Sequence, residues 1–251
     1  MSCVDIRGCR IGEGRPKVIL PIVERAEAAI LEKAAQFSTL QADCVEWRVD
    51  YFEGARAPGA VARCLAKMRV ILRDKLLLVT FRTKAESGEQ ALSHPEYLAF
   101  LRLILDTDCA DLLDIEFFTA GADLPKLVEQ AHSAGVAVVC SSHDFAKTPP
   151  RAELVCRMVQ MQQAGADLPK LAVMPRCRTD VLELLAATAE MADLHPETPV
   201  ITMSMGTLGA VSRLAGETFG SAMTFANPGQ ASAPGQVSLN IVNEVLDALH
   251  L

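Results

Sequence analysis

No stretch of the 251-residue sequence is long and apolar enough to span a bilayer, and residues 1–7 lack the apolar core of a signal peptide. We therefore expect a cytoplasmic protein that has no membrane partner. The eight cysteines include no C-x-x-C pair, and no histidine stands at zinc spacing from them. We expect reduced thiols and no metal site.

An excess of positive charge is also missing. The chain has 24 Lys and Arg against 31 Asp and Glu, which gives a formal net charge of -7. This balance argues against a nucleic-acid partner, although a local group of arginines can still bind a small anion. A soluble enzyme that acts on an anionic small molecule fits these bounds.

The sequence does contain a regular alternation of apolar runs with amphipathic segments, which indicates a parallel sheet covered by helices. Eight such units in 251 residues predict one α/β domain over residues 1–251, a closed (β/α)8 TIM barrel preceded by a short hairpin at 4–11. An open doubly wound sheet is the alternative, but no strand leads into a G-x-G-x-x-G turn. The predicted strands are 18–22, 44–48, 76–81, 112–115, 136–141, 168–174, 199–203 and 221–225. The predicted helices are 24–37, 58–73, 95–106, 124–133, 150–164, 180–192, 210–215 and 237–249.

Polar residues follow most of the predicted strands, at the end of the barrel where chemistry gathers in this fold. Taken together, one lysine, one histidine, three arginines and several carboxylates on one rim of an apolar barrel favour a functional site over packing. The residues are Glu46, Arg48, Arg82, Glu86, Asp114, Glu116, His143, Lys170 and Arg213, with a Gly/Pro/Ser-containing loop at 226–236.

Each residue taken singly also has a structural interpretation. Glu46 and Arg48 share one face of a strand and could form a simple ion pair. His143 could belong to a helix cap, and Arg213 could lie on a solvated helix. Lys170 could sit at a strand end and reach water through its long side chain.

The functional interpretation is a specific chemistry. A lysine amine that has lost its hydration near arginines could form an imine with a ketone, and the iminium would withdraw electrons from the adjacent carbon. A histidine could take a proton from that carbon and later protonate a departing hydroxyl. Arginines would bind a carboxylate, while Glu46 and Gln236 could bind hydroxyls. The set predicts elimination or aldol chemistry on a small hydroxylated keto acid.

The ordered motifs resemble those of the type I 3-dehydroquinate dehydratase (3-dehydroquinase) family over nearly the whole chain. They are EWRVD at 46–50, FRTKAE at 81–86, SHDF at 142–145, PKLAVMP at 169–175, MG at 205–206, SR at 212–213 and SAPGQ at 232–236. The resemblance implies a homodimeric barrel without a metal or organic cofactor. It also implies a hydro-lyase that converts 3-dehydroquinate to 3-dehydroshikimate in the shikimate pathway of aromatic amino acid biosynthesis.

Carried over to this sequence, the resemblance makes Lys170 the lysine that forms the Schiff base and His143 the general acid/base. Glu86 would be the carboxylate that orients the histidine. The residues around the substrate carboxylate would be Arg213, Ser232 and Gln236, and those around the ring hydroxyls Glu46, Arg48 and Arg82. The loop at 226–236 would be a lid.

Two positions depart from the family pattern. Pro21 stands where many relatives have a serine, so a hydroxyl contact to the substrate would be missing. Ser87 replaces the first glycine of the usual Glu-Gly-Gly, which restricts the backbone there.

Two other functions remain as alternatives: a Schiff-base aldolase of the same barrel class, which would need a phosphate-binding site, and a binding or regulatory barrel without turnover.

Overall fold

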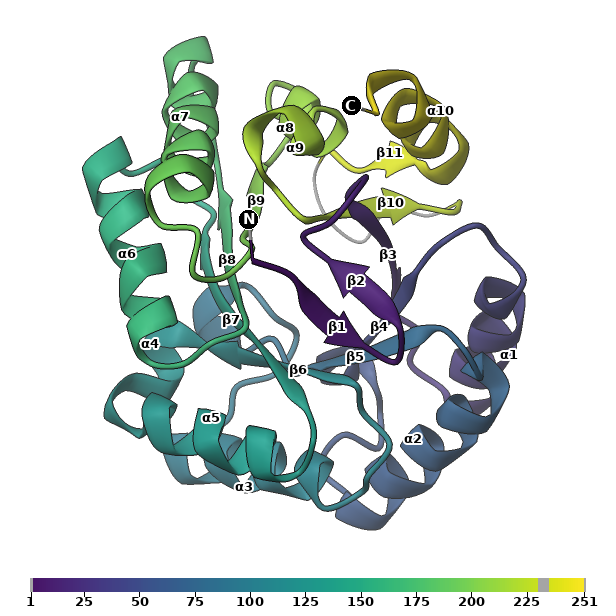
Figure 1. Ribbon diagram of the computed structural model, residues 1–251. Coiled ribbons are helices and arrows are strands. Elements are labelled where there is room, and N and C mark those ends of the chain that lie inside the picture. The colour runs from purple at the N-terminus through teal and green to yellow at the C-terminus, as the bar shows by residue number, and fades with distance from the viewer. Residues whose placement is uncertain (1, 230–234, 251) are drawn as a thin grey trace.

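The computed structural model describes residues 2–229 and 235–250, and this part of the chain forms the predicted barrel (Figure 1). Nine strands make one sheet in the order β11-β10-β3-β4-β5-β6-β7-β8-β9, and β3 to β10 form the barrel. The sheet curls until β9 and β10 meet, where a parallel bridge joins Val200 to Ser221 and Ala222 N donates to Val200 O at 2.8 Å. The barrel strands are β3 (Lys17–Ile22), β4 (Cys44–Arg48), β5 (Leu76–Thr80), β6 (Leu112–Glu116), β7 (Ala137–Asp144), β8 (Leu168–Val173), β9 (Ile201–Ser204) and β10 (Met223–Asn227).

Helices surround the barrel because each buries one apolar face against the strands (Figure 1). In α5 the buried residues are Leu124, Leu127, Val128 and Ala131, at helical spacing. The helices are α1 (Glu27–Ser38), α2 (Pro58–Leu72), α3 (His94–Leu105), α4 (Phe117–Ala120), α5 (Leu124–Ser133), α6 (Arg151–Gln163), α7 (Arg178–Leu194), α8 (Ala210–Leu214), α9 (Gly216–Phe219) and α10 (Leu239–Leu249). Short 3-10 turns are η1 (Val49–Tyr51), η2 (Lys84–Glu86) and η3 (Gly121–Asp123).

The N-terminal hairpin closes one end of the barrel. Its strands β1 (Val4–Ile6) and β2 (Cys9–Ile11) pair antiparallel, as predicted. Ile11 is fully buried in the cluster that fills the barrel interior, with Ile19, Leu112 and Ile201 from the N-terminal halves of the strands. The hairpin lies across the front of the barrel in Figure 1. A ligand cavity is therefore expected at the opposite, C-terminal end.

The prediction that the last helix starts at residue 237 is wrong. Val237–Ser238 form a two-residue strand, β11, which pairs in parallel with Ala226 and Asn227 of β10, and α10 begins only at Leu239. The cause is tertiary, because the end of β10 offers backbone groups that two residues can pair with. The short helices α4 and α9 and the 3-10 turns were not predicted.

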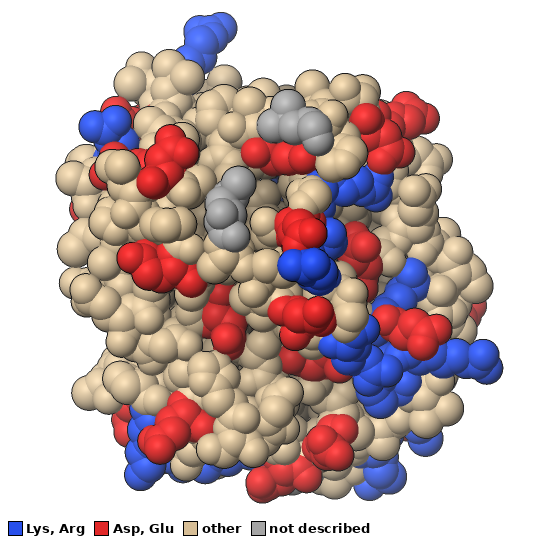
Figure 2. Space-filling model, viewed as in Figure 1, with Lys and Arg blue, Asp and Glu red and all other residues tan. Residues whose placement is uncertain are grey.

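All eight cysteines are free thiols. Within the described part of the chain, none of the helices combines the length and apolar character needed to cross a membrane. On the hairpin side of the molecule, acidic side chains are spread over the whole face, whereas the largest group of basic ones lies on the right of Figure 2 and the others are scattered along the edges.

Candidate active site

The barrel interior changes from apolar to polar toward the C-terminal ends of five neighbouring strands. Alternate residues of a strand face opposite sides, so residues two apart share the inward side. Each inward row starts in the apolar interior cluster and ends with polar or cavity-lining side chains. The rows are Cys44, Glu46 and Arg48 from β4; Leu78, Thr80 and Arg82 from β5 and the residues after it; Leu112, Asp114 and Glu116 from β6; Val139, Ser141 and His143 from β7; and Leu168, Lys170 and Ala172 from β8.

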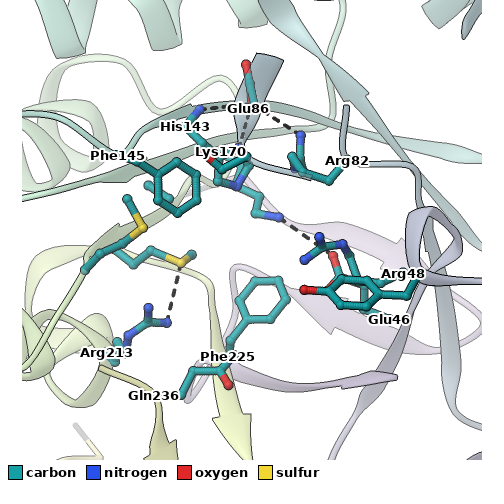
Figure 3. Close-up of a pocket in the computed structure, with 15 residues that line it drawn as sticks. Glu46, Arg48, Arg82, Glu86, His143, Phe145, Lys170, Arg213, Phe225 and Gln236 are labelled. Carbon is teal, nitrogen blue, oxygen red and sulfur yellow. Dashed lines mark hydrogen bonds and ion pairs between the residues drawn. The ribbon is translucent and has the colours of Figure 1, made fainter. Parts of the chain in front are cut away.

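These rows surround a cavity of about 240 Å³ (Figure 3). Every residue to which the sequence assigned a role in the site, apart from Ser232, lines this one cavity; Ser232 lies outside the described residues. Asp114 and Glu116, which the sequence also placed at this rim, are fully buried and do not line it. The polar lining residues are Glu46, Arg48, Arg82, Glu86, Ser87, His143, Lys170, Arg213 and Gln236, and the others are Tyr51, Phe145, Ala172, Met203, Met205 and Phe225.

Lys170 is 3% exposed, so the interpretation in which it reaches water is wrong. Its Nζ lies 3.3 Å from Asp114 Oδ2 and 4.0 Å from Glu46 Oε1, and 4.7 Å from the centroid of the Phe225 ring. The immediate neighbours of the amine are therefore two carboxylates and an aromatic face. The sequence had suggested an amine beside arginines.

Arg82 forms hydrogen bonds with three buried carboxylates at the cavity. Its Nη2 donates to both oxygens of Asp114 at 2.9 Å, and its Nη1 donates to Glu116 at 3.0 Å, to Ser141 at 3.0 Å and to Glu86 at 3.3 Å. Burial alone would lower the pKa of Arg82, but the three carboxylates outweigh it and raise that pKa. The guanidinium is therefore a permanent positive charge in the floor of the site.

His143 and Glu86 form a hydrogen-bonded pair. His143 Nδ1 lies 2.7 Å from Glu86 Oε2, and the same oxygen accepts the backbone N–H of His143 at 3.1 Å. Burial, with smaller contributions from the cations Arg82, Lys170 and Arg48, holds the pKa of the imidazole well below 6.5. Burial also raises the pKa of Glu86, to about 8, against the opposing effect of Arg82.

The helix-cap interpretation of His143 is wrong, because His143 and Asp144 end strand β7 and the next helix begins only at Arg151. Asp144 accepts the backbone N–H groups of Ala146 and Lys147 in the turn that follows, each at 2.9 Å. The His143 ring instead stacks near Phe145, with centroids 6.2 Å apart and planes at 17°. Because Nδ1 is held by Glu86, the other ring nitrogen, Nε2, is left for a ligand in the cavity.

Arg48 pairs with Asp50, which excludes the suggested Glu46–Arg48 pair. The guanidinium donates through Nε and Nη2 to the two oxygens of Asp50, each at 2.8 Å. Glu46 instead accepts the hydroxyl of Thr80 at 2.8 Å. The 3-10 turn η1 follows Arg48 directly and brings Asp50 back toward it.

Arg213 lies on α8 but is only 2% exposed, so the solvated-helix interpretation is wrong as well. Its Nη1 lies 3.5 Å from the sulfur of Met203, and burial lowers the pKa of Arg213 to about 10. Gln236, just ahead of β11, lines the same side of the cavity (Figure 3). A cation in an apolar wall is suited to an anionic ligand group.

The two departures from the family pattern are visible in the backbone and in the packing. Ser87 ends η2 with φ 63°, a left-handed conformation that favours glycine. At Gly88 a Cβ would lie 1.8 Å from the carbonyl oxygen of Arg82, so the second glycine is required by space. Pro21 is buried in β3 and does not line the cavity.

Sequence reasoning did not assign a role to Asp50, Asp114, Glu116 or Ser141, all of them fully buried. For Asp114 and Glu116 the available signal was a carboxylate at an inward position of a buried strand, which needs a cationic partner there. Among the described residues, no group of three or more His, Cys, Asp or Glu side chains is arranged to hold a metal ion.

Comparison with known proteins agrees with this geometry. Residues 18–251 match the family model for type I 3-dehydroquinase. The chain is 46% identical over 250 residues to the 3-dehydroquinate dehydratase of Bacillus subtilis, covering 100% of this chain and 98% of that protein. It is 48% identical over 246 residues to that of Clostridium kluyveri, covering 98% and 96%.

Two solved structures are also similar to this chain. The type I 3-dehydroquinate dehydratase of Clostridium difficile, solved with covalently modified comenic acid, has a TM-score of 0.96 and 42% identity, with 99% of this chain and 98% of that chain covered. The 3-dehydroquinate dehydratase of Enterococcus faecalis has a TM-score of 0.93 and 40% identity, with 99% and 100% covered. The chain belongs to the type I 3-dehydroquinase family.

Proposed function

We propose that this protein is a hydro-lyase that dehydrates 3-dehydroquinate to 3-dehydroshikimate and water through an imine on Lys170. The step belongs to the shikimate pathway of aromatic amino acid biosynthesis. The observation that carries the proposal is a 3%-exposed lysine on β8 that lines the same cavity as His143 on the adjacent strand β7. Family membership supports the same substrate.

In the proposed mechanism, the Lys170 ammonium gives up one proton and the resulting amine attacks the ring ketone. That proton is taken up again as water leaves, which gives the iminium. His143 Nε2 then takes a proton from the adjacent carbon, because Nδ1 is engaged by Glu86. The electron pair released moves toward the iminium. His143 next returns a proton to the hydroxyl that departs, and water finally hydrolyses the imine to free Lys170.

The proposed substrate contacts follow the charges of the cavity. Arg213 and Gln236 would bind the substrate carboxylate, together with Ser232. Arg48 and Glu46 would bind ring hydroxyls through the donors and lone pairs that Asp50 and Thr80 leave available. Arg82 lines the cavity too, but most of its donors are engaged by carboxylates, so we propose that it chiefly orients Glu86.

A Schiff-base aldolase is the competing function. Arg213, buried in the wall of the cavity beside Met203, is the arginine that we propose for binding an anion. One such cation suits a carboxylate better than the phosphate that these aldolases usually hold. The high identity to 3-dehydroquinate dehydratases supports the same choice.

The test is an assay of purified protein with 3-dehydroquinate, in which the conjugated product is followed by its ultraviolet absorbance. We expect turnover by the wild type and its loss in Lys170→Ala. A sugar phosphate is assayed in parallel, and cleavage of it without dehydration would favour the aldolase. Absence of both reactions would favour a binding or regulatory barrel without turnover and would contradict the proposal.

We further propose that residues 1–251 act as a single domain, that the active form is a homodimer in the cytoplasm, and that turnover needs neither metal nor organic cofactor. Light scattering at several concentrations tests the dimer, and a mass equal to one chain at all of them would contradict it. Turnover that disappears after dialysis against a chelator would contradict the last part.

A further inference from the structure

Asp114 places a fully buried carboxylate directly beside the nitrogen that would react. It lies on β6, and its Oδ2 is 3.3 Å from Lys170 Nζ. Arg82 donates to both of its oxygens, and the Ser141 hydroxyl donates to Oδ1 at 2.6 Å. Asp114 does not line the cavity. It approaches Lys170 from the N-terminal side of the barrel and therefore leaves the substrate space free.

The surroundings keep this carboxylate ionised. Burial alone would raise the pKa of Asp114, but the charges of Arg82 and Lys170 outweigh burial and lower that pKa below its usual value of 3.8. An acid that holds no proton at working pH cannot serve as a proton carrier. Its contribution to the site is therefore a fixed negative charge.

A fixed negative charge beside Lys170 can stabilise the positive charge that the nitrogen carries during imine formation. A lysine ammonium and a ketone combine to give a protonated imine and one water, with no net gain or loss of protons. The nitrogen thus carries one positive charge both before and after the reaction. Only the protonated imine draws electrons from the adjacent carbon strongly enough to acidify it.

We propose that Asp114 is the counter-ion that keeps the Lys170 imine protonated during proton abstraction. The inference rests on the proposed function, because it presupposes an imine on Lys170. Glu46, 4.0 Å from the nitrogen, is a second and more distant negative charge, and the Phe225 ring gives the cation an aromatic face at 4.7 Å. Because Asp114 contacts the nitrogen that reacts, it is a catalytic residue in this proposal.

A purely structural role for Asp114, as an anchor for Arg82, is the alternative. Two substitutions separate the roles. Asp114→Asn removes the charge and keeps the shape, whereas Ser141→Ala removes a hydrogen bond to both Asp114 and Arg82 and keeps the charge beside the lysine. The other charged or titratable groups that line the cavity are common to both variants: Glu46 and Arg48 from β4, Tyr51 from η1, Arg82 and Glu86 after β5, His143 from β7 and Arg213 from α8.

The experiment uses two hydride donors. Cyanoborohydride reduces an imine only when it is protonated, whereas borohydride reduces both forms. Each variant is mixed with 3-dehydroquinate across a range of pH, and the reduced adduct is quantified by mass spectrometry. The readout is the pH at which the ratio of cyanoborohydride adduct to borohydride adduct falls by half.

We expect this half-point in the wild type to lie above that of the imine formed in solution from 3-dehydroquinate and n-butylamine. In Asp114→Asn it should move down by about one to three pH units, with borohydride trapping retained. In Ser141→Ala it should stay within about half a unit of the wild type, because the nearby charge is unchanged.

The possible failures are distinguishable. No adduct in the wild type with either reagent refutes the imine itself and therefore the proposed function. Equal half-points in the wild type and Asp114→Asn overturn the counter-ion while the imine stands, and loss of both adducts in folded Asp114→Asn does the same. If that variant does not fold, a wild-type half-point equal to that of the solution imine overturns the inference.

Discussion

Asp50→Asn tests whether Arg48 works only when its guanidinium is held in place. Asp50 is fully buried and accepts four N–H groups: two from Arg48 at 2.8 Å, the backbone N–H of Arg82 at 3.3 Å and that of Glu89 at 3.1 Å. An asparagine of the same shape keeps one oxygen. Its amide N–H₂ group would face two of these four donors.

The magnitude follows from the bonds that are lost. Hydrogen bonds to a charged group contribute about 1.5–3 kcal/mol each, and an unpaired buried group adds its own cost. Losing one of the two Arg48 bonds and one backbone bond should lower the free energy of unfolding by about 3–6 kcal/mol. A misoriented Arg48 that loses about 1.4 kcal/mol or more of substrate binding raises KM about tenfold or more. We expect a smaller change in kcat.

Asp167→Asn is the matched control. Asp167 accepts the backbone N–H of Val138 at 2.7 Å and lies 2.8 Å from His132, at the opposite end of the barrel. Urea unfolding and steady-state kinetics should show a loss of stability in both variants but a rise of KM in Asp50→Asn alone. A KM within twofold of wild type in folded Asp50→Asn would show that Arg48 needs no such support.

Three further outcomes are expected. His143→Ala should lower kcat by about 10²–10⁴-fold, while borohydride still traps the imine; near-normal turnover would remove the histidine from its role. The pKa of His143 is held well below 6.5 by burial and three nearby cations, so the base is still neutral at that pH. The acid limb of kcat/KM should therefore be centred below 6.5, and a limb centred above it contradicts the assignment. Ser87→Gly should raise the free energy of unfolding by up to about 1 kcal/mol, because Ser87 has φ 63°; a clear loss in urea unfolding would show that the hydroxyl makes a contact that matters more.

The barrel could be predicted because its strands are buried on both sides and so appear as continuous apolar runs. The strand at 44–48 and the helix at 124–133 were predicted with the bounds that the structure has. The strand at 237–238 could not be predicted, since two residues carry no periodicity. Their conformation depends on the free end of β10.

The convergence of the candidate residues was predictable, but their partners were not. Parallel strands end at one rim, so the polar residues after them had to meet there. Arg48 was free to pair with Glu46 or with Asp50, and the choice depends on the turn η1. Asp114 and Glu116, at the end of the predicted strand 112–115, were placed at this rim without a role, and the cost of burying both could have predicted a cationic partner for them.

The most direct test of the central claim is to trap the substrate on the enzyme. Borohydride is added to the wild type and to Lys170→Ala in the presence of 3-dehydroquinate, and the peptides are then mapped by mass spectrometry. The account predicts one reduced adduct on the peptide that contains Lys170, and none in the variant. An adduct on another lysine, or no adduct while turnover is normal, would contradict it.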